Sequence, residues 1–335
     1  MKWLSDQVLS RLQAEAQLPD LSGTRYRLVR FLARGGMGTV WLAEDLVLQR
    51  KVALKILELD TATGEFAARL SREALVLAHL EHPGIVPIHD AGTLPDGRAF
   101  YCMKYVEGQT LEQNLPATLP ERLRLCQRIA EPLAFAHARG IIHRDLKPSN
   151  IMVGAFGEVL IMDWGLAKIA QDSLHKADPP LSSADDLHSD SFGSRGQLAP
   201  TSYGKILGTP GYMSPEQARG DADLIDLRTD VYSLGAILKF MLADCPTRHE
   251  GQTFNLRQLH AICEKARAAE PGERYSSVEE LSADVGRYLQ GQPVAAYREG
   301  MIEQALRLYG RHRTAVVLVL VYLVMRVLFI LFSRN

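Results

Sequence analysis

The alternation of apolar and polar positions divides the chain into parts of different character. The segment YRLVRFLARGGMGTVWLAEDLVLQRKVALKIL, which begins at position 26, alternates around a glycine cluster and predicts two β-hairpins. Apolar residues at helical spacing predict a helix over 65–80, and two further strands are expected over 85–88 and 98–106. The first part of the chain is therefore expected to be a small unit rich in β-structure.

Beyond position 111 the pattern becomes mostly helical. The stretch ERLRLCQRIAEPLAFAHARG predicts a helix that stops at Gly140, and a second apolar helix is expected to open at Arg228. Between them, residues 151–153 and 158–162 flank a turn and predict a small hairpin whose end presents Asp163. These elements predict an α+β protein with a β-rich N-terminal lobe and a helical C-terminal lobe.

Two segments fall outside this pattern. Residues 1–20 have apolar positions at mixed three- and four-residue spacings, which predict a short amphipathic helix that ends near Pro19. This helix could pack on its own domain or dock on a partner, and it lacks the unbroken apolar core of a signal peptide. The stretch 171–206 is rich in Ser, Asp, Gly and Pro and is expected to be a mobile insertion.

The C-terminal stretch 315–332, AVVLVLVYLVMRVLFILF, has one charge in eighteen residues and predicts a transmembrane helix. A helix of this length extends about 27 Å, close to the ~30 Å thickness of the hydrocarbon layer. Arg326 costs about 2.5–3.5 kcal/mol on insertion scales, which the surrounding apolar residues offset at about 0.3–0.6 kcal/mol each. An amphipathic or buried C-terminal helix is the alternative. The basic segment 291–314 before the span predicts a single-pass protein of the cell membrane with its preceding domain in the cytoplasm.

Composition narrows the classes of partner. The chain has 335 residues and a formal net charge of −1, which provides no field for binding a polyanion, so nucleic acid is not expected. The four cysteines have no metal-ligand spacing and are expected to be reduced thiols. They are Cys102, Cys126, Cys245 and Cys263.

The octapeptide HRDLKPSN, residues 143–150, carries the strongest chemical signal. It offers a base, a cation and a metal ligand at fixed offsets, which are Asp145, Lys147 and Asn150. A hydroxyl that attacks the γ-phosphate of ATP needs a carboxylate to orient it, a positive charge on the transferred group and Mg²⁺. The pattern therefore predicts phosphoryl transfer, against the alternative of a surface turn with chance charges.

The octapeptide resembles the catalytic loop of bacterial Hanks-type (eukaryotic-like) membrane-anchored Ser/Thr protein kinases, and lysine two residues after the aspartate is the Ser/Thr form. Four more motifs follow the order of that family: the glycine cluster, VALK at 52–55, DWG at 163–165 and GTPGYMSPE at 208–216. The resemblance covers about 26–289 and implies a bilobal kinase domain over 26–290, with an N-lobe over 26–106 and a C-lobe over 107–290. Residues 1–25 would be an N-terminal extension.

The resemblance implies an ATP site between the lobes. Its glycines would let the backbone approach a phosphate, although Ala33 replaces the first glycine of the family pattern. Lys55 would hold the phosphates and pair with Glu73, while Met103 would be the gatekeeper beside the hinge. The full set implied for the nucleotide is Ala33, Arg34, Gly35, Gly36, Gly38, Val40, Ala53, Lys55, Glu73, Met103, Lys104, Val106 and Met152.

The same resemblance implies the Mg²⁺ ligands and the residues that support them. Asp163 and Asn150 would each hold an ion, with Trp164 in place of the phenylalanine of DFG. Asp230 would steady the backbone of the catalytic loop, and Arg274 would pair with Glu216.

A regulatory role is expected for the segment between DWG and GTPGYMSPE. Arg144 precedes the catalytic aspartate and is expected to be a buried charge that needs an anion. We expect autophosphorylation at Thr201 or Ser202, in trans within a possible homodimer, to supply that anion. Thr209 is expected to lie near the substrate hydroxyl and Asp145.

The expected function is therefore transfer of phosphate from ATP to Ser or Thr of protein substrates. One alternative is a pseudokinase scaffold, motivated by Ala33, Trp164 and a shortened region after Asp244 that puts substrate docking in doubt. A second alternative is a small-molecule kinase, against which the peptide platform implied by GTPGYMSPE argues.

Overall fold

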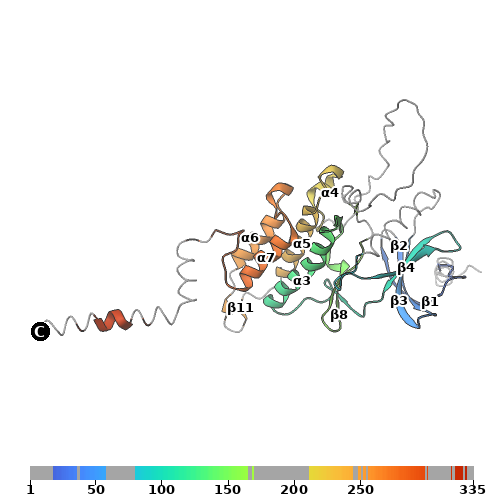
Figure 1. The fold of residues 1–335 in the computed structure, drawn as a ribbon, viewed down its shortest axis with the longest axis horizontal. Helices are drawn as coiled ribbons and strands as arrows, with labels where there is room; N and C mark the ends of the chain where they lie inside the picture. The colour runs from blue at the N-terminus through green and yellow to red at the C-terminus, as the bar shows by residue number, and fades with distance from the viewer. Residues whose placement is uncertain are drawn as a thin grey trace, which may run out of the picture.

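The computed structural model describes residues 18–35, 38–57, 80–164, 168–169, 211–243, 248–249, 252–253, 256–298, 300, 318, 321–326 and 329. Within these ranges a β-sheet lobe stands beside a helical lobe (Figure 1). The two lobes match the β-rich and helical parts that the apolar pattern predicts.

The N-lobe is a five-stranded antiparallel sheet in the order β1-β2-β3-β5-β4. Its strands are β1 (Tyr26–Gly35), β2 (Gly38–Asp45), β3 (Arg50–Leu57), β4 (Ile88–Thr93) and β5 (Ala99–Lys104). Successive side chains of a strand point to opposite faces, so β3 buries Val52 and Leu54 in one apolar cluster and Ala53 in another. The second cluster includes Leu160, which comes from the strand just before Asp163.

The strand predicted over 85–88 is displaced. Strand β4 begins at Ile88, whereas Ile85 forms only an isolated bridge with Ile161 of β9 (Val159–Ile161). Pro87 has no N–H with which to continue a ladder, and the N–H of Val86 donates to the Ile161 carbonyl at 3.2 Å. The apolar run therefore connects the two lobes instead of extending the sheet.

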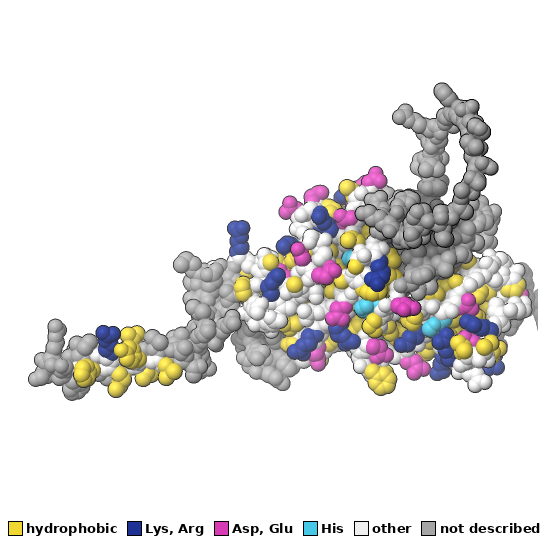
Figure 2. All heavy atoms as spheres, in the orientation of Figure 1, with side chains coloured by type: hydrophobic (Ala, Val, Ile, Leu, Met, Phe, Trp, Pro, Cys, Tyr) yellow, Lys and Arg dark blue, Asp and Glu magenta, His cyan; other side chains and the backbone are white. Residues whose placement is uncertain are grey.

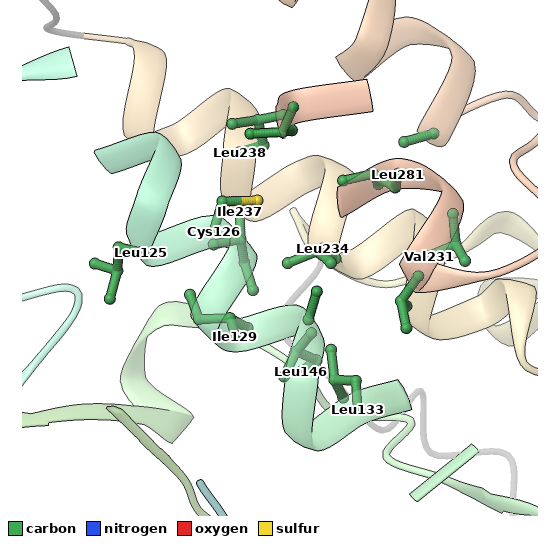
Figure 3. Close-up of a cluster of buried hydrophobic side chains, with 14 of the residues drawn as sticks. Leu125, Cys126, Ile129, Leu133, Leu146, Val231, Leu234, Ile237, Leu238 and Leu281 are labelled. Carbon is green, nitrogen blue, oxygen red and sulfur yellow. The ribbon is translucent and has the colours of Figure 1, made fainter. Parts of the chain in front are cut away.

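The C-lobe is built around α3 (Leu119–His137) and α5 (Arg228–Leu242). Each of these helices buries one face in a continuous apolar core (Figure 3). The helices α6 (Leu256–Ala266) and α7 (Val278–Leu289) contribute side chains to the same core. Thr118 caps α3 because its side chain accepts from the Glu121 N–H, while the Glu121 carboxylate accepts from the Thr118 N–H. Leu146 of the octapeptide packs in the same core, so the helices support the loop 143–150.

Short elements make up the rest of the described structure. A three-stranded sheet orders β6 (Gly108–Thr110), β8 (Ile151–Gly154) and β9, and β7 (Ile141–Ile142) pairs with β10 (Lys168–Ile169). The others are η1 (Pro148–Asn150), α4 (Pro215–Arg219), η3 (Ala222–Leu224), β11 (Arg248–His249), β12 (Gln252–Thr253) and η4 (Pro271–Glu273).

The packed part of the C-lobe continues beyond the predicted boundary at 290. Asp284 of α7 is fully buried, and its carboxylate accepts from the N–H groups of Ala295 at 2.6 Å and Ala296 at 3.0 Å. Val294 is 3% exposed and belongs to the apolar core. Residues 291–297, which the sequence assigns to the basic segment before the membrane, therefore belong to the lobe.

Most of the predicted transmembrane stretch lies outside the described residues. Its described part, residues 318, 321–326 and 329, is helical, and the apolar side chains there are 47–74% exposed (Figure 2). Among the helices that the structure describes, none combines the length and the apolar composition needed to cross a membrane. The predicted span therefore stays a prediction.

Candidate active site

Strand pairing brings Lys55 to the inner face of the N-lobe sheet. Lys55 of β3 lies opposite Tyr101 of β5, and its ammonium is 5.8 Å from the centroid of the Tyr101 ring. The Lys55 side chain is 8% exposed and forms an ion pair with Asp163. Burial alone would lower the pKa of Lys55, but Tyr101 and the Asp163 carboxylate raise it to about 12. The lysine is therefore a permanent cation at this site.

Asp163 lies directly beyond β9, where the predicted hairpin presents it. Its backbone has a φ of 61°, a conformation that few residues other than glycine adopt. Burial would raise the pKa of the carboxyl group, yet Lys55 lowers it, so Asp163 is an anion. The hydroxyl of Tyr101 donates to its Oδ1 at 3.4 Å. A strained backbone that presents a charged group is typical of a functional site.

The three chemical groups of the octapeptide lie together. The Lys147 ammonium contacts Oδ2 of Asp145 at 2.8 Å. The amide nitrogen of Asn150 donates to the Asp145 carbonyl at 2.8 Å and to Oδ2 at 3.3 Å. Both contacts to the Asp145 carboxylate use Oδ2, so within the described residues Oδ1 of Asp145 is the oxygen left to accept a substrate proton.

Asp230 of α5 holds the backbone of this loop by hydrogen bonds. Its carboxylate is fully buried and accepts from the N–H of His143 at 2.8 Å and the N–H of Arg144 at 2.9 Å. His137 lies 2.8 Å from the same carboxylate, and its interaction overcomes burial to lower the pKa of Asp230. The φ of Arg144 is 66°, so these bonds hold a conformation that is unfavourable for arginine. The predicted role of Asp230 as a backbone support is present in the structure.

His143 connects the catalytic loop to the DWG segment. Its Nε2 lies 2.9 Å from the Met162 carbonyl, and its Nδ1 accepts from the Asp145 N–H at 3.3 Å. The Trp164 ring packs against the imidazole with centroids 4.7 Å apart, and its Nε1–H donates to the Ile161 carbonyl at 3.3 Å. Trp164 is 5% exposed and therefore serves as a structural anchor beside Asp163.

Apolar side chains form the wall implied for the nucleotide. Ala53, Met103 and Val106 are buried in one cluster, with Val40 and Met152 packed against it. A small cavity of about 20 Å³ lies behind Met103, with room for about one water molecule. The cavity is lined by Ile85, Val86, Ile88, Tyr101, Met103, Asp163 and Trp164. Ala33 and Arg34 are exposed at the end of β1, and Lys104 is exposed at the end of β5.

No side chain fits at Gly38, and the reason that the structure shows differs from the predicted one. A Cβ at this position would lie 2.0 Å from the Ile56 carbonyl, and the φ of Gly38 is 154°. The pairing of β2 with β3 therefore excludes other residues here, whereas the sequence suggests close approach to a phosphate.

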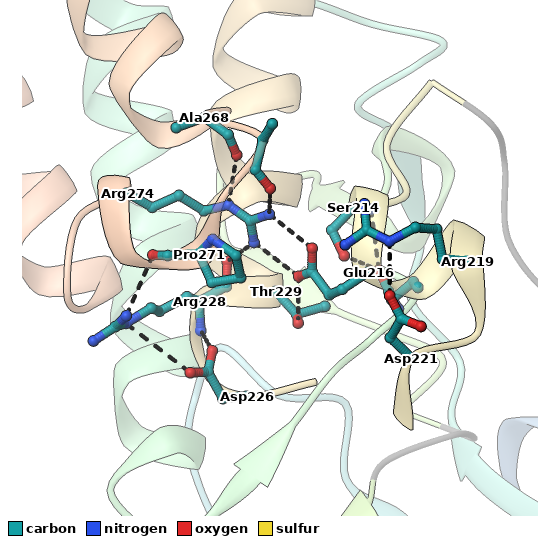
Figure 4. A network of polar contacts seen from close by, with 12 residues as sticks. Ser214, Glu216, Arg219, Asp221, Asp226, Arg228, Thr229, Ala268, Pro271 and Arg274 are labelled. Carbon is teal, nitrogen blue, oxygen red and sulfur yellow. Dashed lines mark hydrogen bonds and ion pairs between the residues drawn. The ribbon is translucent and has the colours of Figure 1, made fainter. Parts of the chain in front are cut away.

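The segment that ends in GTPGYMSPE is fixed at its last residue, Glu216, by a buried ion pair (Figure 4). Arg274 and Glu216, both 0% exposed, meet through two hydrogen bonds of 2.7 and 2.8 Å. Thr229 also donates to Glu216 at 3.0 Å. Burial would raise the pKa of Glu216, but the Arg274 guanidinium lowers it to about 2. The pair that the resemblance implies is present, and it fixes the segment to the C-lobe.

We expect removal of Arg274 to destabilise the protein strongly. Arg274→Met leaves the Glu216 carboxylate buried without its partner, so the free energy of unfolding should fall by about 3–5 kcal/mol in urea denaturation of the full chain. The matched control is Arg219→Met, because Arg219 forms an exposed ion pair with Asp221, and its denaturation curve is expected to match that of the wild type closely.

The same pair predicts a pH dependence of stability. The pKa of Glu216 falls from 4.5 to about 2 on folding, so its contribution is complete above pH 4.5 and is lost as pH falls toward 2. The variant Glu216→Gln should be less stable at neutral pH and should lose less stability than the wild type over that window. Equal acid sensitivity of the two proteins in denaturation curves would contradict this assignment.

Three supporting residues were missed by the sequence analysis. Tyr101 lies against Lys55 and Asp163, and His137 contacts Asp230. Gln217 donates to the Arg144 carbonyl at 2.6 Å and so joins α4 to the catalytic loop. An alternation analysis of β5 could have placed Tyr101 on the inner face beside Lys55, whereas the two other contacts join segments 73 and 93 residues apart and leave no local signal.

Several predicted residues lie outside the described ranges. They are Gly36, Glu73, Thr201, Ser202 and Thr209, together with residues 1–17 of the predicted N-terminal helix, residues 65–79 of the helix predicted over 65–80 and the insertion over 171–206. The Lys55–Glu73 pair and the phosphorylation sites therefore stay predictions. Arg144, which was expected to be buried, is half-buried, and its backbone N–H donates to Asp230.

The site residues present oxygen ligands suited to Mg²⁺. Among the residues that the structure describes, the side-chain contacts of Asp163 use Oδ1 only, and Asn150 uses its amide nitrogen for Asp145, so one carboxylate oxygen and one amide oxygen are left to bind a cation. Mg²⁺ prefers one or two carboxylates together with phosphate oxygens and water. In the described part of the chain, no three His, Cys, Asp or Glu side chains gather as a metal site.

The chain is similar to known proteins in sequence and in fold. The family model for the protein kinase domain matches residues 26–292. Serine/threonine-protein kinase PknD of Chlamydia caviae is 38% identical over 307 residues, covering 80% of this chain and 32% of that protein. PknD of Chlamydia felis is 37% identical over 307 residues, covering 80% and 31%. The chain thus spans about a third of the length of these curated relatives.

A solved structure has the same bilobal arrangement. The kinase domain of PknI from Mycobacterium tuberculosis superposes with a TM-score of 0.54 at 28% identity. The match covers 79% of this chain and 96% of that domain.

Proposed function

Since this chain belongs to the protein kinase domain family, we propose that it is an active Ser/Thr protein kinase that transfers the γ-phosphate of ATP to hydroxyl groups of protein substrates. The observation that carries the proposal is a pair of charged clusters, Lys55 with Asp163 and Asp145 with Lys147 and Asn150. The imidazole of His143 joins the two clusters through the Met162 carbonyl and the Asp145 N–H. A scaffold without activity has no need for this complete set of charged groups.

Each residue has a distinct task in the proposed reaction. Asp145 accepts the proton of the substrate hydroxyl at Oδ1, while Lys147 and Asn150 hold its other oxygen in place. Lys55 positions the phosphates, and Asp163 with Asn150 would hold Mg²⁺. Mg²⁺, when bound, would neutralise charge that develops on the phosphate oxygens. The Ser/Thr preference rests on Lys147, two residues after the aspartate, and on the similarity to PknD.

The test is phosphoryl transfer by the purified full chain. Incubation with Mg·ATP and a generic basic protein should place phosphate on serine or threonine of that protein or of the chain itself, as read by mass spectrometry. Binding of Mg·ATP without any transfer would support the pseudokinase alternative. Transfer to small molecules but not to any peptide would support the second alternative.

We also propose that residues 315–332 anchor the chain in the cell membrane with the kinase domain in the cytoplasm. The exposed apolar side chains at Leu318, Val321 and Phe329 and the arginines before the stretch support this proposal. The full chain expressed in bacterial cells should sediment with membranes and need detergent for release. Recovery in the soluble fraction, or digestion of the kinase domain by protease outside intact cells, would contradict it.

A further inference from the structure

Tyr101 is a buried tyrosine whose hydroxyl points into the catalytic site. The residue is 7% exposed and lies in β5 directly opposite Lys55 of β3. Its neighbour Phe100 points to the other face of the sheet, where it packs edge to face on Tyr26. Packing alone would be satisfied by phenylalanine at position 101, as it is at position 100, so the hydroxyl needs an explanation of its own.

The hydroxyl shares one oxygen of Asp163 with Lys55. Tyr101 donates to Oδ1 at 3.4 Å, and the Lys55 ammonium contacts the same atom. Two donors from the sheet thus fix the Asp163 carboxylate from one side. Of the two carboxylate oxygens, Oδ2 receives no hydrogen bond from the residues that the structure describes, and the Asp163 side chain is 37% exposed.

We propose that Tyr101 is a positioning residue that orients the Asp163 carboxylate for a divalent cation bound with the nucleotide. This inference rests on the proposed function, in which Lys55 turns to the nucleotide phosphates and Asp163 holds the metal. A lysine that serves the phosphates no longer fixes Asp163 alone. Tyr101 then remains as the donor that holds Oδ1 and keeps Oδ2 directed at the cation.

The surroundings of Tyr101 fit this role. Tyr101 is 7% exposed and lines the small cavity together with Met103 and Trp164, so its hydroxyl is held in a buried position. The backbone on both sides is held by the β3 and β4 ladders. A hydrogen bond from a rigid partner outside the metal's own ligands typically accounts for 10- to 100-fold in metal affinity.

The experiment measures Mn²⁺ binding to the full chain saturated with ADP. Mn²⁺ shares the preference of Mg²⁺ for oxygen ligands, and its free form gives an electron paramagnetic resonance signal that falls on binding. In Tyr101→Phe we expect the Mn²⁺ dissociation constant to rise about tenfold, while the affinity for ADP without metal stays unchanged. Tyr101→Met should show the same change and provides a second variant in case one folds poorly.

Tyr26→Phe is the matched control. Tyr26 is a buried tyrosine of the same sheet, 5% exposed, whose hydroxyl donates to the Asp90 carboxylate at 2.7 Å on the face away from the site. We expect this variant to bind Mn²⁺ as the wild type does. Wild-type Mn²⁺ affinity in both Tyr101 variants would overturn the inference and leave the kinase proposal standing, and equal weakening in the control would overturn it in favour of a general loosening of the sheet. Absence of Mn²⁺ binding by wild type would instead overturn the proposed metal site itself.

Discussion

Asp145→Asn should reduce the rate of phosphoryl transfer by about 10²–10⁴-fold, because the variant loses the group that takes the proton from the substrate hydroxyl. Asparagine has nearly the same shape, so the contact with the Asn150 side chain and the backbone bonds of the loop to Asp230 are expected to persist. The affinity for Mg·ATP and the thermal unfolding temperature should therefore remain close to those of the wild type. Single-turnover kinetics at saturating ATP measure the loss directly.

Asp96→Asn provides the matched control for this loss. Asp96 forms its ion pair with Arg98 in the turn between β4 and β5, away from the catalytic loop. The same change of one charge there should leave the transfer rate within a factor of about two, since exposed pairs contribute little. Retention of more than a tenth of the wild-type rate in Asp145→Asn would exclude Asp145 as the base.

The part of the fold that local sequence determines could be predicted well. Strand β3 and helix α5 follow from apolar periodicity, and the loop from His143 to Asn150 follows from its motif. The exception is informative, because the apolar run at Ile85 and Val86 looks like a strand but bridges to β9. Periodicity shows that residues are buried, and it does not show against which element they pack.

The contacts of the candidate site also divide into those that the local sequence predicts and those that it does not. Asp145, Lys147 and Asn150 lie within six residues, so their contacts could be expected from the motif alone. The Lys55–Asp163 pair joins residues 108 apart in sequence, and only the pairing of strands and the hairpin before Asp163 bring them together. Such contacts depend on tertiary packing, for which the sequence carries no local signal.

Lys55 contacts a residue other than its predicted partner. The resemblance implies a pair with Glu73, which lies outside the described residues, while the structure shows the lysine against Asp163 and Tyr101. An ammonium that contacts Asp163 occupies part of the position expected for a divalent cation. In the proposed function, Lys55 therefore exchanges this contact for one with the phosphates when the nucleotide and its metal bind.

This exchange makes Lys55→Met the second variant with a large expected effect. The transfer rate should fall by about 10²–10³-fold, because the fixed cation that stabilises charge on the phosphates is lost. Lys55→Arg should fail as well, since its planar guanidinium cannot replace a compact ammonium in a buried position. Methionine is close to lysine in length and leaves Asp163 without its competing cation, so binding of the divalent metal with ADP should survive or become tighter.

The control is Lys51→Met on the same strand. Lys51 pairs with Glu107 at 3.2 Å, and both side chains are more than 60% exposed, so the variant should transfer phosphate at the wild-type rate. The combination expected for Lys55→Met, a lost rate with retained metal binding, separates a role in positioning phosphate from a role in folding. Loss of metal binding together with the rate would show that the Lys55–Asp163 contact is needed to hold Asp163 in place, and a normal rate would remove Lys55 from the reaction.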